Sequence, residues 1–124
     1  MDFVESYLEE CNRVIAGLDR EALRKLARLF VTVRAAGGRV FVLGVGGSAA
    51  TASHFVNDLR KITRMEAYAP TDNVAELTAR TNDDGWASTF AGWLRGSRLR
   101  AEDLVMVLSV GGGDAAKNIS PNLV

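Results

Sequence analysis

The sequence is poor in cysteine and proline and contains no long hydrophobic run. Cys11 is the only cysteine, so an intrachain disulfide is impossible and the disulfide-rich secreted class is excluded. No stretch approaches the roughly 18 consecutive apolar residues of a membrane-spanning helix. Residues 1–5 have neither the basic n-region nor the apolar h-region of a signal peptide. We therefore expect a cytoplasmic protein with no membrane partner.

An excess of charge of either sign is also missing. Fifteen basic residues balance fifteen acidic ones, so no net field favours binding to nucleic acid or to an anionic membrane. The nearest local basic cluster comprises Arg95, Arg98 and Arg100, which we interpret as a solvated helix end. We expect no nucleic-acid partner.

The 124 residues have the usual size of one domain, and their first part is helical in pattern. Apolar residues recur at three- and four-residue steps from Phe3 to Leu18, and again after Asp19, a candidate helix cap. Gly37 and Gly38 end the second pattern. Residues 1–36 are therefore predicted to form two amphipathic helices, which either mediate oligomerisation or cover the sheet.

The rest of the chain alternates between strand and helix patterns. Apolar runs predict buried strands at residues 39–43 and 104–108 and a weaker strand at residues 65–69. Helices are expected at residues 49–62, after a cap at Asn82 or Asp83, and from Ala115, whereas residues 71–80 are predicted to be a loop and a short helical turn. This alternation predicts an α/β fold with a parallel sheet.

Two glycine-rich segments follow the clearest strands. Residues 44–48 read Gly-Val-Gly-Gly-Ser, and residues 109–114 read Ser-Val-Gly-Gly-Gly-Asp. Glycines let main-chain N–H groups approach an anion, a helix N-terminus adds a favourable dipole, and Ser48 and Ser109 add hydroxyl donors. Tight turns without a ligand are the plainer interpretation of either segment alone, but together they favour a phosphate clamp. Neither the dinucleotide nor the Gly-Lys-Ser/Thr motif is present, so NAD and ATP are not expected.

His54 and Asp58 lie four residues apart on the helix predicted after the first loop. At this spacing the two side chains share one helix face, where they can bind a metal ion together or act as acid and base. Such a pair is usually only a surface contact. Its place after a candidate phosphate loop favours a functional role.

These residues resemble the signature of phosphoheptose isomerases, a branch of the SIS superfamily. Residues 44–59 resemble the family's Gly-Asn-Gly-Gly-Ser…His-Phe…Glu-Leu pattern. Residues 81–85 are similar to its Asn-Asp segment, and residues 109–114 stand where the family has Ser-Thr-Ser-Gly-Asn-Ser. The resemblance covers essentially the whole chain and implies a three-layer αβα, flavodoxin-like SIS fold whose C-terminal part lies beyond residue 124.

The resemblance also implies an activity and a set of site residues. The family interconverts sedoheptulose 7-phosphate and a mannoheptose 7-phosphate in homotetramers, often with zinc, at sites between subunits. By position, His54 and Asp58 match metal ligands, and both are expected to be catalytic, with Asp58 moving the proton. The residues implied to bind substrate or its phosphate are Val45, Gly46, Gly47, Ser48, Asn82, Asp83, Ser109, Val110, Gly111 and Asp114.

Several positions depart from the family pattern. Val45 replaces an asparagine, Gly111 and Asp114 replace serines, and Asp58 replaces a longer glutamate. The family's metal and acid/base site also uses a glutamine and a histidine from a part that follows residue 124. A sugar-phosphate isomerase is therefore the first hypothesis. A non-catalytic SIS module that binds a phosphosugar or a protein partner is the alternative, and the loop substitutions favour it.

Overall fold

The computed structural model describes residues 2–124, which divide into two compact units at the bond between Thr32 and Val33. The first unit holds helix α1, Phe3–Ala16, and most of helix α2, Arg20–Ala35. A capping box begins α1, because the Asp2 carboxylate accepts the Glu5 N–H at 2.9 Å and the Glu5 side chain reaches back to the Asp2 N–H. The Asp19 carboxylate accepts the N–H groups of Glu21 and Ala22, so the predicted cap of α2 is confirmed.

Helix α1 carries an apolar face. None of its residues is buried, and the exposed apolar side chains of this helix and the following turn are Phe3, Val4, Tyr7, Leu8, Val14, Ile15 and Leu18. The expectation that residues 1–36 form an oligomer surface stays a prediction.

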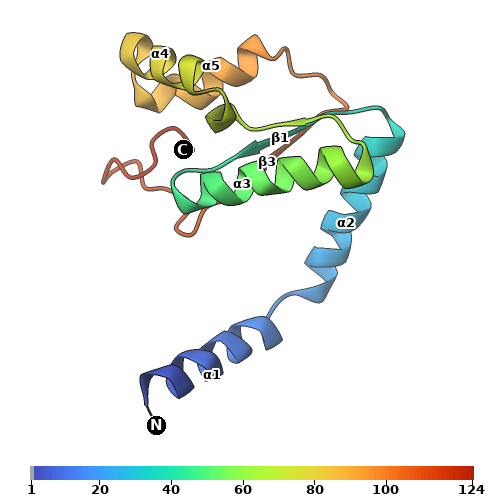
Figure 1. The fold of residues 1–124 in the computed structure, drawn as a ribbon, viewed down its shortest axis with the longest axis vertical. Coiled ribbons are helices and arrows are strands. Elements are labelled where there is room, and N and C mark those ends of the chain that lie inside the picture. The colour runs from blue at the N-terminus through green and yellow to red at the C-terminus, as the bar shows by residue number, and fades with distance from the viewer. Residues whose placement is uncertain (1) are drawn as a thin grey trace. The chain divides into compact units, whose positions relative to one another are not determined.

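The second unit is a three-stranded parallel sheet with helices on both faces (Figure 1). Strands β1, Val40–Leu43, β2, Ala67–Tyr68, and β3, Leu104–Val107, are ordered β2-β1-β3. In register, Val40 lies opposite Ala67 on one side and Leu104 on the other. The predicted parallel pairing of the strands near 39–43 and 104–108 is thus confirmed, and the weak strand shortens to two residues.

Alternate residues of β1 point to the two faces of the sheet, and all four are buried. Phe41 and Leu43 pack against Phe90 and Trp93 of helix α5, Thr89–Gly96, with the Phe41 and Trp93 rings edge to face at a centroid distance of 5.5 Å. Helix α3, Gly47–Asp58, contacts β1 and β2 and buries Ala52 and Val56. It continues as a π-helical turn, Leu59–Thr63.

The segment between β2 and α5 is more helical than its sequence pattern suggested. A 3₁₀ turn, Pro70–Asp72, leads into helix α4, Val74–Asp84, where a loop and a short turn were expected. The Asn73 side chain caps α4 by accepting the Glu76 N–H at 3.1 Å. The prediction that Asn82 or Asp83 caps the next helix is therefore wrong. Both lie in the last turn of α4, and a 3₁₀ turn, Trp86–Ser88, connects to α5.

The expected helix at Ala115 is also absent from the described residues. Asp114 and Ile119 instead form an isolated antiparallel bridge around a tight turn, in which the Asp114 carboxylate accepts the Lys117 N–H at 3.1 Å. Asn118 and Ser120 have positive φ angles of 54° and 46°, which a helix does not allow. A turn in which Leu123 donates its N–H to the Ser120 carbonyl then ends the chain. Within residues 2–124, no helix is both long and apolar enough to cross a membrane.

Candidate functional site

The two glycine-rich loops meet at the carboxyl ends of β1 and β3, as the parallel pairing requires. They share one cavity of about 190 Å³, which is lined by Val45, Ser48, Leu108, Ser109, Val110, Gly111, Ser120 and Leu123. We refer to it as the loop pocket. Its volume is below the roughly 300–1,000 Å³ of pockets for drug-sized ligands, so it suits one small group, such as a phosphate.

Close backbone contacts shape the first loop. A Cβ atom on Gly44 would lie 2.5 Å from the carbonyl carbon and oxygen of Ser48, so only glycine fits where the chain turns from β1 into α3. Gly46 has a φ angle of 60°, in the left-handed region that glycine tolerates. The loop thereby delivers Ser48 to the first turn of α3, where the helix dipole favours an anion.

The second loop offers hydroxyl and main-chain donors. The Ser109 oxygen accepts the Gly112 N–H at 2.9 Å, which leaves its own hydroxyl hydrogen free to donate to a ligand. Gly112 and Gly113 have φ angles of 73° and 83°. Ser120, which sequence reasoning missed, is a third serine that lines the loop pocket. No sequence pattern indicates Ser120, because its place in the loop pocket depends on the turn that the Asp114–Ile119 bridge closes.

Asp114 does not line the loop pocket in the described part of the chain. Its carboxylate is engaged by the Lys117 N–H, and the Lys117 ammonium lies 3.9 Å away. The negative charge that replaces a family serine is therefore paired within its own turn.

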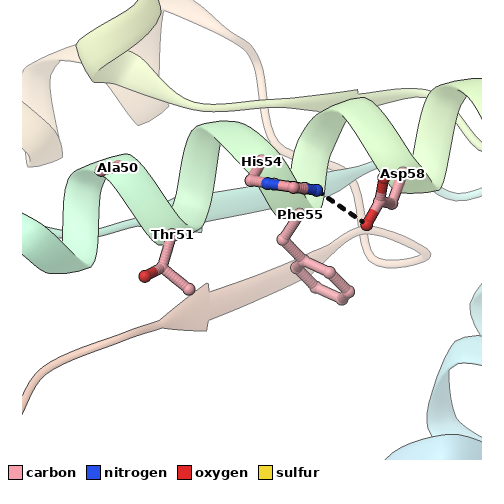
Figure 2. A pocket seen from close by; sticks show the side chains of 5 residues that line it. All are labelled: Ala50, Thr51, His54, Phe55 and Asp58. Carbon is pink, nitrogen blue, oxygen red and sulfur yellow. Dashed lines mark ion pairs between the residues drawn. The ribbon is translucent and has the colours of Figure 1, made fainter.

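His54 and Asp58 lie on the outer face of α3 and point toward one another (Figure 2). His54 Nε2 is 3.5 Å from Asp58 Oδ2, and the side chains are 77% and 43% exposed. They line a second, open pocket with Ala50, Thr51 and Phe55. This pocket shares no lining residue with the loop pocket, so within one chain the pair and the first loop belong to separate pockets.

The separation of the two donor atoms fits a shared zinc ion. Two ligands that each lie about 2.0–2.1 Å from a tetrahedral zinc are roughly 3.4 Å apart, close to the 3.5 Å between His54 and Asp58. No group of three His, Cys, Asp or Glu side chains within residues 2–124 is placed to hold a metal. The pair can therefore supply two ligands, and the remaining ligands must come from outside these residues.

Asn82 and Asp83 are placed away from both pockets. Asn82 Nδ2 donates to Asp83 Oδ1 at 3.0 Å, and both side chains are exposed at the end of α4. The structure therefore unites Val45, Ser48, Ser109, Val110 and Gly111 but leaves two other groups of expected site residues, His54–Asp58 and Asn82–Asp83, separate.

Comparison with known proteins identifies the family of the chain. Residues 2–119 match the model of the SIS domain family. The chain is 33% identical over 130 residues to the lincomycin biosynthesis protein LmbN of Streptomyces lincolnensis. This match covers 97% of this chain and 46% of LmbN. It is 36% identical over 97 residues to the phosphoheptose isomerase of Mycobacterium tuberculosis, covering 74% of this chain and 49% of that enzyme.

A solved structure shows the same likeness in three dimensions. Phosphoheptose isomerase GmhA from Neisseria gonorrhoeae superposes with a TM-score of 0.80 at 25% identity, covering 97% of this chain and 64% of the GmhA chain. The chain spans about half the length of the curated relatives described above. On the match of residues 2–119, this chain belongs to the SIS domain family and is phosphoheptose isomerase-like.

Proposed function

We propose that the protein is an aldose–ketose isomerase of a phosphorylated sugar, interconverting sedoheptulose 7-phosphate and D-glycero-D-manno-heptose 7-phosphate or a close relative. The observation that carries this proposal is the loop pocket, in which Ser48, Ser109 and Ser120 converge from three segments. Hydroxyl donors, glycine main chain and the N-terminus of α3 together suit a phosphate group.

The loop pocket would hold the phosphate without a cationic side chain among its lining residues. Charge compensation then comes from N–H dipoles, chiefly those of the second loop and the first turn of α3. Val45, Leu108, Val110 and Leu123 form the apolar part of the wall. Of these, Val45, Leu108 and Leu123 are half-buried and would reduce the access of water to the phosphate, whereas Val110 is fully exposed.

The reacting end of the sugar is assigned to His54 and Asp58. In the ketose, a base takes the proton from C1 and the C2 oxygen gains a proton, which gives the enediol. The C1 hydroxyl then loses its proton as C2 is protonated, so the carbonyl moves to C1. Asp58 is the proposed base, and His54 lies beside it on the same helix face. Zinc bound at the pair would polarise the carbonyl and stabilise the oxyanion.

Ser48 and His54 are six residues apart on α3, so about 9 Å of helix axis separates them. That length is comparable to an extended sugar phosphate, but the two side chains point to different sides of the helix. A second copy of the chain against the exposed face of α3 is the proposed means of completing the site. Asn82 and Asp83 are proposed to contact the sugar in that assembly.

An assay of isomerisation tests this proposal. The protein is incubated with sedoheptulose 7-phosphate or with sedoheptulose, and the aldose is measured. Turnover is expected only with the phosphorylated sugar, and both His54→Ala and Asp58→Asn should lower kcat by at least about 100-fold. A matched change at an exposed α1 position, Asn12→Ala, should leave kcat unchanged.

The alternative is a non-catalytic module that binds a phosphosugar or a protein partner. Val45 and Gly111 favour it, because they remove polar side chains from the loops. Under this alternative the phosphorylated sugar binds to the loop pocket but is not converted, and His54→Ala leaves its binding unchanged.

A further inference from the structure

The two oxygens of the Asp58 carboxylate have different partners. Oδ2 faces His54 Nε2 at 3.5 Å, whereas Oδ1 accepts a hydrogen bond from the side-chain amide of Asn57 at 3.2 Å. We infer that Asn57 is a positioning residue that fixes the plane of the Asp58 carboxylate so that Oδ2 stays beside His54. This inference rests on the proposed function of the His54–Asp58 pair.

Consecutive helical residues point about 100° apart, so a hydrogen bond between neighbours is not imposed by the helix. Here the Asn57 amide turns toward the next side chain. Within residues 2–124, Asp58 has only Asn57 and His54 as side-chain partners. Removing the amide would therefore leave the carboxylate free to rotate away from the imidazole.

The chemistry of the donor suits a carboxylate that must stay ionised and available. A neutral amide orients one oxygen without adding a positive charge that would compete with a metal ion. Aspartate is also shorter than the glutamate of the family pattern, so its orientation matters more for its reach. Partners of this kind around a ligating carboxylate typically contribute 10- to 100-fold to metal affinity.

A second pair of neighbouring residues makes the same hydrogen bond, which shows that this bond alone does not define the role proposed for Asn57. Asn82 donates to Asp83 at 3.0 Å at the end of α4, but no imidazole faces the other Asp83 oxygen in the described residues. The Asn–Asp hydrogen bond is thus available at more than one helix end. What distinguishes Asp58 is the histidine on its second oxygen.

His54 is the only histidine, so its ring gives a single set of imidazole NMR signals that reports zinc binding without activity. The 124-residue chain, with Cys11→Ser to remove the thiol ligand, is titrated with Zn²⁺. Asn57→Ala is expected to weaken the zinc response of the His54 ring at least about 10-fold. Helix content by circular dichroism should not fall, because alanine is the best helix former. Asn12→Ala, the same change on α1, should match the parent, and Asp58→Ala should abolish the response.

The outcomes separate the two proposals. Suppose that Asp58→Ala abolishes the zinc response of the His54 ring but Asn57→Ala binds zinc as tightly as Asn12→Ala does. This result would overturn only the positioning role of Asn57. A zinc response that survives Asp58→Ala, or a parent that shows no response, would overturn the metal pair and the positioning role with it.

Discussion

The guanidinium of Arg39 donates to the carboxylate of Asp103 at 2.7 Å, and this contact joins the residues that precede β1 and β3. The Asp103 side chain is 1% exposed and also accepts the N–H groups of Arg39 and Arg100. Arg39 in turn donates to the carbonyls of Ser97 and Arg98. The contact therefore fixes the register that brings both glycine-rich loops to one edge.

Asp103→Asn tests this role. Burial opposes ionisation of Asp103, but hydrogen bonds from the Arg39 side chain and main chain and from the Arg100 N–H, with the Arg39 charge, outweigh it and hold the pKa well below its usual range. The substitution removes the charge from a buried, paired site and should lower the free energy of unfolding by about 2–3 kcal/mol. Urea unfolding at neutral pH measures this. Asp72→Asn, which changes an exposed side chain that accepts a hydrogen bond from Ser53, should lower the free energy of unfolding by less.

The depressed pKa of Asp103 also predicts a pH dependence. Between the folded and unfolded pKa values the unfolded chain binds more protons, so stability rises with pH there. The contribution of Asp103 is fully present above its unfolded pKa of about 3.9 and is lost as pH falls toward the folded value. Asp103→Asn should remove this part of the acid destabilisation. An acid-unfolding curve unchanged by the substitution would contradict the assignment.

Gly44→Ala probes the turn into α3. The new Cβ would meet the Ser48 main chain at 2.5 Å, so the first loop must move or the fold must lose about 3 kcal/mol. Gly47→Ala is the matched control, because a Cβ there meets nothing within 4 Å and its φ is not positive. Thermal unfolding of both variants should show a large loss for the first and almost none for the second. Equal melting temperatures would refute the close-approach argument.

The serines of the loop pocket should contribute to phosphate binding. Ser109→Ala and Ser120→Ala each remove one hydroxyl donor, and each is expected to weaken binding of inorganic phosphate about 5- to 10-fold, as for one hydrogen bond to a charged group. Isothermal titration or amide NMR shifts of residues 109–113 measure the effect. Ser88→Ala, whose hydroxyl donates within its own turn, is the control. If Ser109→Ala and Ser120→Ala weaken phosphate binding no more than Ser88→Ala does, the loop pocket is not the phosphate site.

The exposed apolar face of α1 predicts self-association. A continuous exposed face with Tyr7, Leu8 and Ile15 is costly in water and is typical of an interface. Leu8→Glu should shift the mass measured by light scattering from an oligomer toward a monomer, whereas Asn12→Glu on the same helix should not. A monomer for the unmodified chain at micromolar concentration would contradict the prediction.

Much of this fold could be predicted from the sequence, because strong local patterns specified it. Residues 40–43 are apolar without interruption and became a strand buried on both faces, and Asp19 capped a helix as expected. Residues 71–80 were expected to be a loop and a short helical turn, because their pattern is ambiguous, although Asn73 caps the helix that follows. Ser120 entered the loop pocket through a turn with two positive φ angles, which no periodicity indicates.

The placement of His54 was predicted only in part for a related reason. Helical spacing correctly paired it with Asp58, since that relationship is local. Whether the pair meets the loop pocket depends on the direction in which α3 faces, and on any second copy of the chain. The spacing of residues along the sequence gives no information on the direction of α3 or on a second copy.

Proton transfer between C1 and C2 is the central claim, and solvent isotope incorporation tests it most directly. The protein is incubated with sedoheptulose 7-phosphate in D₂O, and the sugar phosphates are analysed by mass spectrometry and NMR. Enediol formation by Asp58 predicts deuterium at C2 of the aldose and its loss with Asp58→Asn. A sugar phosphate that binds to the loop pocket but is neither isomerised nor labelled would contradict the isomerase account and support the non-catalytic module.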